Sequence, residues 1–169
     1  MGVVTVKRII VSIIVLFAFS GLCFASEEIT DSARDKAISE IGSLVNSQKY
    51  QSALIKCNNA LKKYPDDAFL YYWKGTILSS LNDKKSALDN FDKSVELNPN
   101  NAKTYVMRGI CKSDLGEKEL ALEDFNKAIE LDSEDGSAYS MRACVKLELG
   151  DYSGADADLD TANKLMNSK

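Results

Sequence analysis

The chain has 169 residues, of which 45% are hydrophobic and 27% charged, a composition typical of an ordinary soluble protein with one main domain. Its formal net charge is −4, and it lacks the clustered Lys and Arg residues that binding to nucleic acid or anionic lipid requires. It contains no histidine, which removes the commonest general base and transition-metal ligand. We therefore expect no catalytic residues, no metal and no cofactor.

Residues 1–25 are predicted to be a secretory signal peptide. Lys7 and Arg8 precede an apolar run over 9–19, and small residues follow up to Ala25, after which cleavage is expected. Cleavage would leave 19 basic and 25 acidic residues, a charge of −6. The alternative is an uncleaved membrane anchor, although the segment 9–25 is at the short limit for spanning a bilayer. Either outcome predicts export, to the periplasm or the extracellular space, with residues 26–33 as a short leader.

An internal repeat accounts for the rest of the chain. Small, aromatic and turn residues recur with a constant period and without a gap, which divides the sequence into four equal units over 34–67, 68–101, 102–135 and 136–169. Each unit contains two amphipathic stretches of helical period separated by a turn signal such as Asn82-Asp83 or Gly116-Glu117. The recurring positions are Tyr71, Tyr105 and Tyr139; Gly75, Gly109 and Ala143; Ala53, Ala87, Ala121 and Ala155; and Cys57, Phe91, Phe125 and Leu159.

The Tyr-x3-Gly and Ala-x3-Phe-x2-Ala patterns, with Pro65 and Pro99 one full repeat apart, closely resemble the tetratricopeptide repeat family. This resemblance implies an all-α fold, a right-handed α-solenoid of antiparallel helix pairs. The first unit departs from the pattern, because Ile41 replaces the Gly and Cys57 replaces the Phe. The expected helix pairing brings small residues such as Gly75 and Ala87 to places where helices approach closely, with the aromatic residues filling the adjoining space.

A column of charged residues supports this register. Arg108 and Arg142 precede Asp124 and Asp158 by the same interval, whereas Glu40 and Lys56 carry the reversed charges in the first unit. We expect these positions to face each other between paired helices as structural ion pairs. The corresponding residues of the second unit are Lys74 and Asn90.

The fourth unit differs from the others on its second helix. Asp156 and Asn163 occupy positions that are apolar in the first three units, namely Leu54 and Leu61, Leu88 and Val95, and Leu122 and Ile129. A polar outer face is expected of a terminal repeat, so we interpret the chain as a complete short array. The run 156–160 also resembles the start of a calcium loop, but Thr161 and Asn167 stand where such a loop needs Gly and Glu.

Three cysteines would remain after cleavage at Ala25. Cys57 is expected to be a buried small hydrophobic residue. Cys111 and Cys144 lie on first helices of neighbouring units, so a disulfide between them is conceivable in an oxidising compartment, although their spacing offsets them by one position in register. No CxxC motif is present, which argues against a redox enzyme.

The family resemblance implies that the first helix of each unit lines a concave groove. Carried onto this register, the candidate partner-binding residues are Phe69, Tyr72, Trp73, Lys103, Val106, Met107, Ile110 and Met141. Aromatic and Met side chains suit an apolar peptide or helix, although the same side chains could instead pack between helices. Some family members hold a chaperone carboxylate with a clamp of basic and Asn residues, of which only Lys103 is present here.

The sequence thus predicts a non-catalytic scaffold or adaptor that binds a protein or peptide, with no nucleic acid and no metal. The alternative is a membrane-tethered assembly factor that retains residues 1–25. A hydrolase or redox enzyme that uses the cysteines is a third hypothesis, which the lack of His and of a nucleophile arrangement disfavours.

Overall fold

The computed structural model describes residues 32–167 of the chain. The chain divides into two units, Met1–Ser39 and Glu40–Lys169, and we describe each by itself. In the first unit, residues 32–39 are helical. The predicted signal peptide and most of the predicted leader lie outside the described residues. No helix within 32–167 is long and apolar enough to cross a bilayer.

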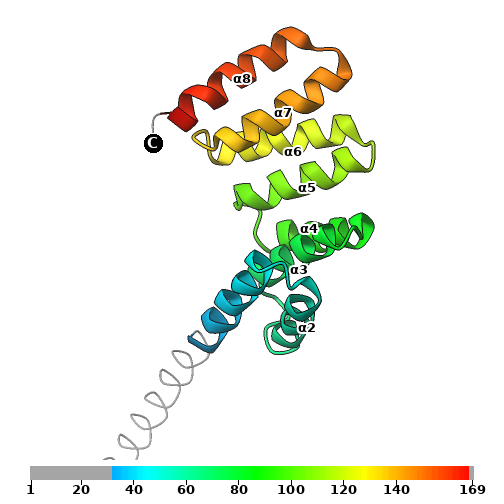
Figure 1. Ribbon diagram of the computed structural model, residues 1–169, viewed down its shortest axis with the longest axis vertical. Helices are drawn as coiled ribbons and strands as arrows, with labels where there is room; N and C mark the ends of the chain where they lie inside the picture. The colour runs from blue at the N-terminus through cyan, green and yellow to red at the C-terminus, as the bar shows by residue number, and fades with distance from the viewer. Residues whose placement is uncertain (1–31, 168–169) are drawn as a thin grey trace, which may run out of the picture. The chain divides into compact units, whose positions relative to one another are not determined.

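The second unit is built from helices alone, and residues 32–167 contain no strand. Residues 40–46 are helical, and seven further helices follow them in chain order (Figure 1). These are α2 (Tyr50–Leu61), α3 (Ala68–Ser80), α4 (Lys84–Leu97), α5 (Ala102–Asp114), α6 (Lys118–Leu131), α7 (Gly136–Leu149) and α8 (Tyr152–Asn167).

Each helix packs mainly on its neighbours in sequence, as expected of a solenoid. The most extensive contacts join α3 to α4, α5 to α6 and α7 to α8, and smaller ones join α4 to α5 and α6 to α7. In addition, α5 touches both α3 and α7, whereas α4, α6 and α8 do not touch one another. Successive pairs are therefore closer on the side of α3, α5 and α7, which makes that side concave.

The predicted turns within the pairs contain residues with a left-handed backbone. Asn82, Gly116 and Gly150 have φ of 65°, 85° and 84°, and Gln48, at the equivalent place before α2, has φ of 57°. Asn and Gly adopt this conformation at lower cost than other residues. The turn signals of the sequence are thus confirmed, and the first turn uses a residue that only the structure identifies.

The core lies where the two helices of a pair meet. Phe91 and Phe125 are at most 1% exposed, and a Cβ on Gly75 or Gly109 would lie 2.7 Å or 2.9 Å from the nearest atom of the respective ring. Each Phe ring therefore occupies the space that a side chain at the Gly would need. The prediction that an aromatic side chain fills the space beside the small residue is confirmed for Gly75 and Gly109.

The second helices differ in exposure as the sequence analysis expected. Asp156 and Asn163 of α8 are exposed, whereas the apolar residues at the equivalent positions of the preceding second helices are half-buried. These half-buried residues are Leu54 and Leu61, Leu88 and Val95, and Leu122 and Ile129.

Candidate protein-binding groove

Three aromatic side chains pack together on α3 at the concave side. The rings of Phe69 and Tyr72 are stacked with centroids 5.6 Å apart, and Trp73 meets them edge-on at 6.1 Å and 5.7 Å. Tyr72 also contacts the buried ring of Phe91, at 6.3 Å between centroids. Because these rings support one another, they form a rigid apolar surface with little side-chain entropy left to lose on binding.

Trp73 is partly a core residue. Its indole packs against the helical segment 40–46, where a Cβ on Gly42 would lie 3.4 Å from a ring carbon. Its Nε1 is buried and has no hydrogen-bond partner among the described residues. Trp73 is predicted from the sequence to be a groove residue, but much of its side chain packs within the fold.

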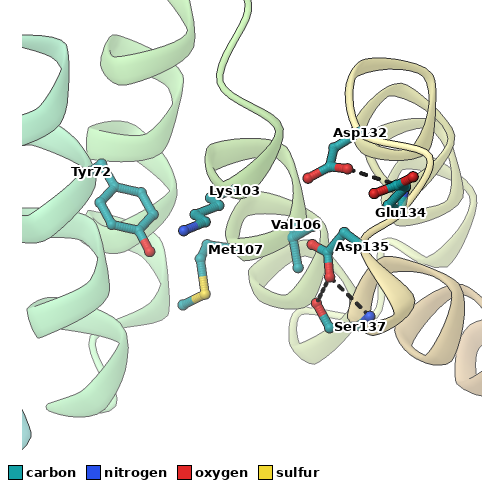
Figure 2. Close-up of a pocket in the computed structure, with 8 residues that line it drawn as sticks. All are labelled: Tyr72, Lys103, Val106, Met107, Asp132, Glu134, Asp135 and Ser137. Atoms are coloured by element: carbon teal, nitrogen blue, oxygen red, sulfur yellow. Dashed lines mark hydrogen bonds between the residues drawn. The ribbon is translucent and has the colours of Figure 1, made fainter. Parts of the chain in front are cut away.

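A pocket of about 500 Å³ lies beside this aromatic cluster (Figure 2). One part of its lining comes from α3 and α5, namely Tyr72, Lys103, Val106 and Met107. The other part comes from the loop between α6 and α7 and the start of α7, namely Asp132, Glu134, Asp135 and Ser137. The structure thus brings four of the eight predicted residues together and adds four that the sequence analysis did not identify.

Local hydrogen bonds hold the loop in place. Asp132 follows the last residue of α6, and its Oδ1 accepts a bond of 3.1 Å from the backbone N of Glu134. Asp135 caps the N-terminus of α7, where its Oδ1 accepts bonds from the backbone N and the Oγ of Ser137, at 2.9 Å and 2.5 Å. The loop therefore presents its carboxylates from a defined backbone.

The remaining predicted residues do not line this pocket. Ile110 and Met141 are half-buried and pack on the core cluster that includes Phe125. Val106 lines the pocket but is only 8% exposed and belongs to the same cluster. Ile110, Met141 and most of Val106 therefore pack between helices, which is the alternative to lining the groove.

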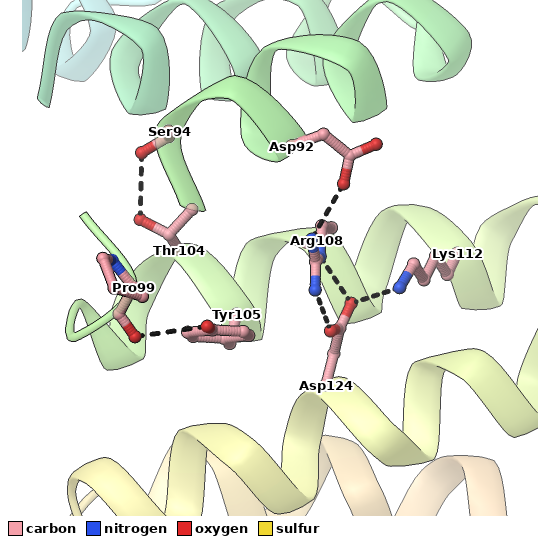
Figure 3. Close-up of polar contacts among 8 residues, drawn as sticks. All are labelled: Asp92, Ser94, Pro99, Thr104, Tyr105, Arg108, Lys112 and Asp124. Carbon is pink, nitrogen blue, oxygen red and sulfur yellow. Dashed lines mark hydrogen bonds and ion pairs between the residues drawn. The ribbon is translucent and has the colours of Figure 1, made fainter. Parts of the chain in front are cut away.

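Behind the groove, the predicted charge column forms a network (Figure 3). Arg108 donates from Nε and Nη2 to the two carboxylate oxygens of Asp124, at 2.9 Å and 2.6 Å, and Lys112 pairs with the same carboxylate at 2.9 Å. Arg108 also reaches back to Asp92 of the preceding pair at 2.8 Å. The network thus joins two repeats as well as two helices.

The same arrangement recurs one repeat later, where Arg142 and Lys146 hold Asp158 at 2.5 Å and 2.9 Å. Glu40 and Lys56 also form an ion pair, so the predicted charge reversal is confirmed. The second repeat has a different arrangement. The side-chain amide of Asn90 donates a hydrogen bond of 2.7 Å to the carbonyl of Ser86 in its own helix.

Asp158 also belongs to the run that resembles a calcium loop. Burial acts to raise the pKa of its carboxyl, but the hydrogen bonds from Arg142 and Lys146 outweigh this and lower the pKa below its usual value. Its carboxylate is thus already neutralised by two cations of the fold. Within residues 32–167, no group of three or more Cys, Asp or Glu side chains is arranged to hold a metal ion.

Cys57, Cys111 and Cys144 are free thiols in the structure. Burial raises the pKa of Cys57 to about 12, only partly offset by Lys74, and its Sγ donates to the carbonyl of Leu70 at 3.3 Å. Burial likewise raises the pKa of Cys111, which is 0% exposed. Cys144 is exposed, so the conceivable bridge between Cys111 and Cys144 is not formed in this structure.

Antiparallel helix pairs that stack with their first helices on one face define an α-solenoid repeat protein, as the sequence predicted. The family model described as tetratricopeptide repeat matches residues 70–101 and 102–135. The match falls on the second and third predicted units, while the count of four units stays a prediction.

Solved structures show the same fold at low sequence identity. A crystal structure of MamA is 18% identical with a TM-score of 0.72, covering 80% of this chain and 79% of that chain. A MamA structure from Desulfovibrio magneticus RS-1 is 23% identical with a TM-score of 0.71, covering 80% and 77%. No curated protein sequence matches the chain significantly.

Proposed function

We propose that this chain is a non-catalytic scaffold or adaptor that captures a segment of a partner protein in its concave groove. The single observation that carries the proposal is the pocket that joins α3, α5 and the start of α7 on the concave side. Its lining spans three successive helix pairs, so an extended or helical segment that crosses the repeats would contact all of them.

The lining supports a protein ligand. Tyr72 and Met107 supply large apolar contact areas, and side chains of these types contribute strongly to protein interfaces. Phe69 continues the apolar surface from Tyr72 along α3. A partner segment with apolar side chains would bury these groups together.

We further propose that this binding takes place outside the cytoplasm, with residues 1–25 removed as a signal peptide. The support is the sequence pattern of Lys7, Arg8 and the apolar run over 9–19. The membrane-tethered alternative differs only in the fate of this segment. Intact mass and N-terminal sequencing of exported protein separate them: a start at Ser26 excludes the anchor, and a retained segment 1–25 excludes the cleaved form.

Position-specific cross-linking tests the groove directly. A photoreactive phenylalanine analogue replaces Ser137, which lines the pocket, or Asp89, which is exposed on α4. We expect light-dependent adducts with one partner at Ser137 and none with that partner at Asp89. Equal adducts at both positions would show that the concave side is not the binding surface.

Two substitutions in the lining provide the second readout. Tyr72→Ser and Met107→Ser should each weaken capture of the cross-linked partner about tenfold, the effect expected of an interface residue worth about 1.4 kcal/mol. The matched control is the pair Ile55→Ser and Leu120→Ser, which alters apolar residues that are 64% and 44% exposed on the second helices. Helical circular dichroism and melting curves verify that every variant is folded at the assay temperature.

A further inference from the structure

The pocket has two chemically different walls (Figure 2). Asp132, Glu134 and Asp135 lie together on one side, which we call the acidic wall. Tyr72, Lys103 and Met107 lie on the opposite side. A ligand that fills the pocket therefore meets negative charge on one flank and an aromatic and thioether surface, with one ammonium, on the other.

The negative charge of the acidic wall is not needed to fold the loop. One repeat earlier, the equivalent residues are the uncharged Asn98, Asn100 and Asn101. The Oδ1 of Asn98 accepts a hydrogen bond of 3.1 Å from the backbone N of Asn100. The Oδ1 of Asn101 accepts one of 3.2 Å from the backbone N of Lys103. The Asp132 and Asp135 Oδ1 atoms accept the equivalent bonds from the backbone, and only the bond from Ser137 Oγ to Asp135 has no counterpart. An amide oxygen therefore serves the backbone as well as a carboxylate.

Within residues 32–167, no Lys or Arg side chain forms an ion pair with Asp132, Glu134 or Asp135 of the acidic wall. Residues 102–135 contain nine acidic and five basic side chains, whereas residues 68–101 contain four of each. Several acidic groups of the third unit are paired within the fold, such as Asp124 with Arg108 and Asp114 with Lys84. The one cation that lines the pocket, Lys103, lies on the wall opposite the carboxylates. A complementary ligand therefore presents positive charge to the acidic wall.

The pocket suits a cationic side chain better than a bare ion. Val106 lies between the two walls, and Met107 and Tyr72 lie on the side of the pocket opposite the carboxylates. An arginine or lysine can lay its methylene stem on such apolar groups while its charged end reaches the carboxylates. Arginine gains more, because its planar guanidinium forms paired hydrogen bonds with a carboxylate.

We infer that the groove selects partner segments in which a lysine or arginine side chain binds the acidic wall and neighbouring apolar side chains contact Tyr72 and Met107. This inference rests on the proposed function and specifies the partner's chemistry. Lys103 adds to this specificity, because its positive charge repels a cationic side chain from the side of the pocket opposite the acidic wall. Association should weaken as salt is raised, since the pairs form near the protein surface.

An unbiased peptide selection tests the inference. Random displayed dodecapeptides are selected on the purified full-length chain, and the recovered sequences are synthesised with blocked termini and titrated by fluorescence anisotropy. We expect enrichment of Arg or Lys at one position next to apolar residues. Citrulline at that position, which keeps the shape of arginine without its charge, should weaken binding at least tenfold.

The decisive variant replaces the acidic wall isosterically by Asp132→Asn, Glu134→Gln and Asp135→Asn, which keeps every oxygen that the backbone uses. The control, Asp89→Asn, Glu123→Gln and Asp160→Asn, removes the same net charge from exposed positions on α4, α6 and α8. Selected peptides should bind the wall variant at least tenfold more weakly and the control within about twofold, because distant exposed charges are screened by salt.

Failure of this inference and failure of the groove itself give different results. If peptides lose affinity for Tyr72→Ser and Met107→Ser but bind the wall variant unchanged, or show no excess of Arg and Lys, the inference of a cationic partner is wrong. The proposal that the groove binds peptides is then still supported. If no peptides are recovered, or if they bind the Tyr72 and Met107 variants unchanged, the groove proposal fails as well.

Discussion

At the scale of single residues, complementary sizes hold the helix pairs together. The positions equivalent to Gly75 and Phe91 combine a smaller residue with a larger one in every predicted unit, but the order and the sizes vary. The pairs are Ile41 with Cys57, Gly75 with Phe91, Gly109 with Phe125, and Ala143 with Leu159. In the fourth unit Ala143 is 0% exposed, whereas Leu159, at the position equivalent to the Phe, is 37% exposed. The first unit reverses the order, which explains why it departs from the family pattern and still packs Ile41 and Cys57 at 0% exposure.

This complementarity predicts a coupled effect of Gly75→Ala and Phe91→Leu. The new Cβ would lie 2.7–2.9 Å from three Phe91 ring atoms, so overpacking of about 1–3 kcal/mol outweighs the gain of about 1 kcal/mol in helix propensity. Phe91→Leu alone should also destabilise, because it leaves a void. The double variant, which copies the fourth unit, should be more stable than the sum of the single effects by at least about 0.5 kcal/mol in urea unfolding.

Gly42→Ala is the matched control for this cycle. Its Cβ would lie 3.4 Å from Trp73, an ordinary contact, so the helix-propensity gain should leave the protein stabilised by up to about 1 kcal/mol. Simple additivity of the Gly75 and Phe91 effects would show that the ring does not limit the residue size at position 75.

At the scale of helices, the N-terminal caps differ between equivalent elements. Asp83 caps α4 and accepts a bond of 3.2 Å from the backbone N of Ser86. Glu117 stands at the equivalent place before α6, with a similar backbone, and makes no side-chain cap bond. The extra methylene of Glu moves its carboxylate away from the position that Asp uses, which leaves backbone donors of α6 to water.

Exchanging the two residue types therefore changes stability in opposite directions. Glu117→Asp should stabilise the protein by about 0.5–1 kcal/mol and Asp83→Glu should destabilise it by a similar amount, because the cap bond is gained in one and lost in the other. Neither change alters the net charge, so the helix dipole contributes little to the difference. Thermal unfolding measures both, and equal shifts of the same sign would contradict the cap explanation.

At the scale of the whole array, stability depends on how many neighbours each helix has. Within Glu40–Lys169, α4, α5 and α6 each pack on a helix before and a helix after them, whereas α8 contacts α7 alone among the described helices. Repeat proteins open locally where neighbour interfaces are fewest. The acidic wall lies in the loop between α6 and α7, and each of these helices packs on a helix before and a helix after it.

Hydrogen exchange should follow this order. Amides of α8 should exchange faster than those of α4 to α6, because opening α8 breaks one helix interface while opening an inner helix breaks two. Mass spectrometry of peptides from each helix measures the ranking. Uniform protection across all helices would indicate a single cooperative unit and would contradict the expected order.

The sequence by itself determined the repeat, the helix pairs and most contacts that recur with it. Turn residues such as Gly116, small residues such as Gly75, and the pairing of Arg108 with Asp124 were predictable because the constant repeat period places each in a fixed environment set by nearby chain. Half of the candidate site was also predictable, since Tyr72, Lys103, Val106 and Met107 lie on first helices at regular positions.

Only the tertiary structure decided which of the eight candidate residues share one pocket and what faces them. Ile110 and Met141 have the same helical register as groove residues, yet they are partly buried against the core cluster. No local sequence pattern predicts that burial. Asp132, Glu134 and Asp135 occupy loop positions that sequence patterns explain as turn and cap residues. They line the same pocket as Tyr72 only because the stacking of three helix pairs brings together side chains that lie far apart in the chain.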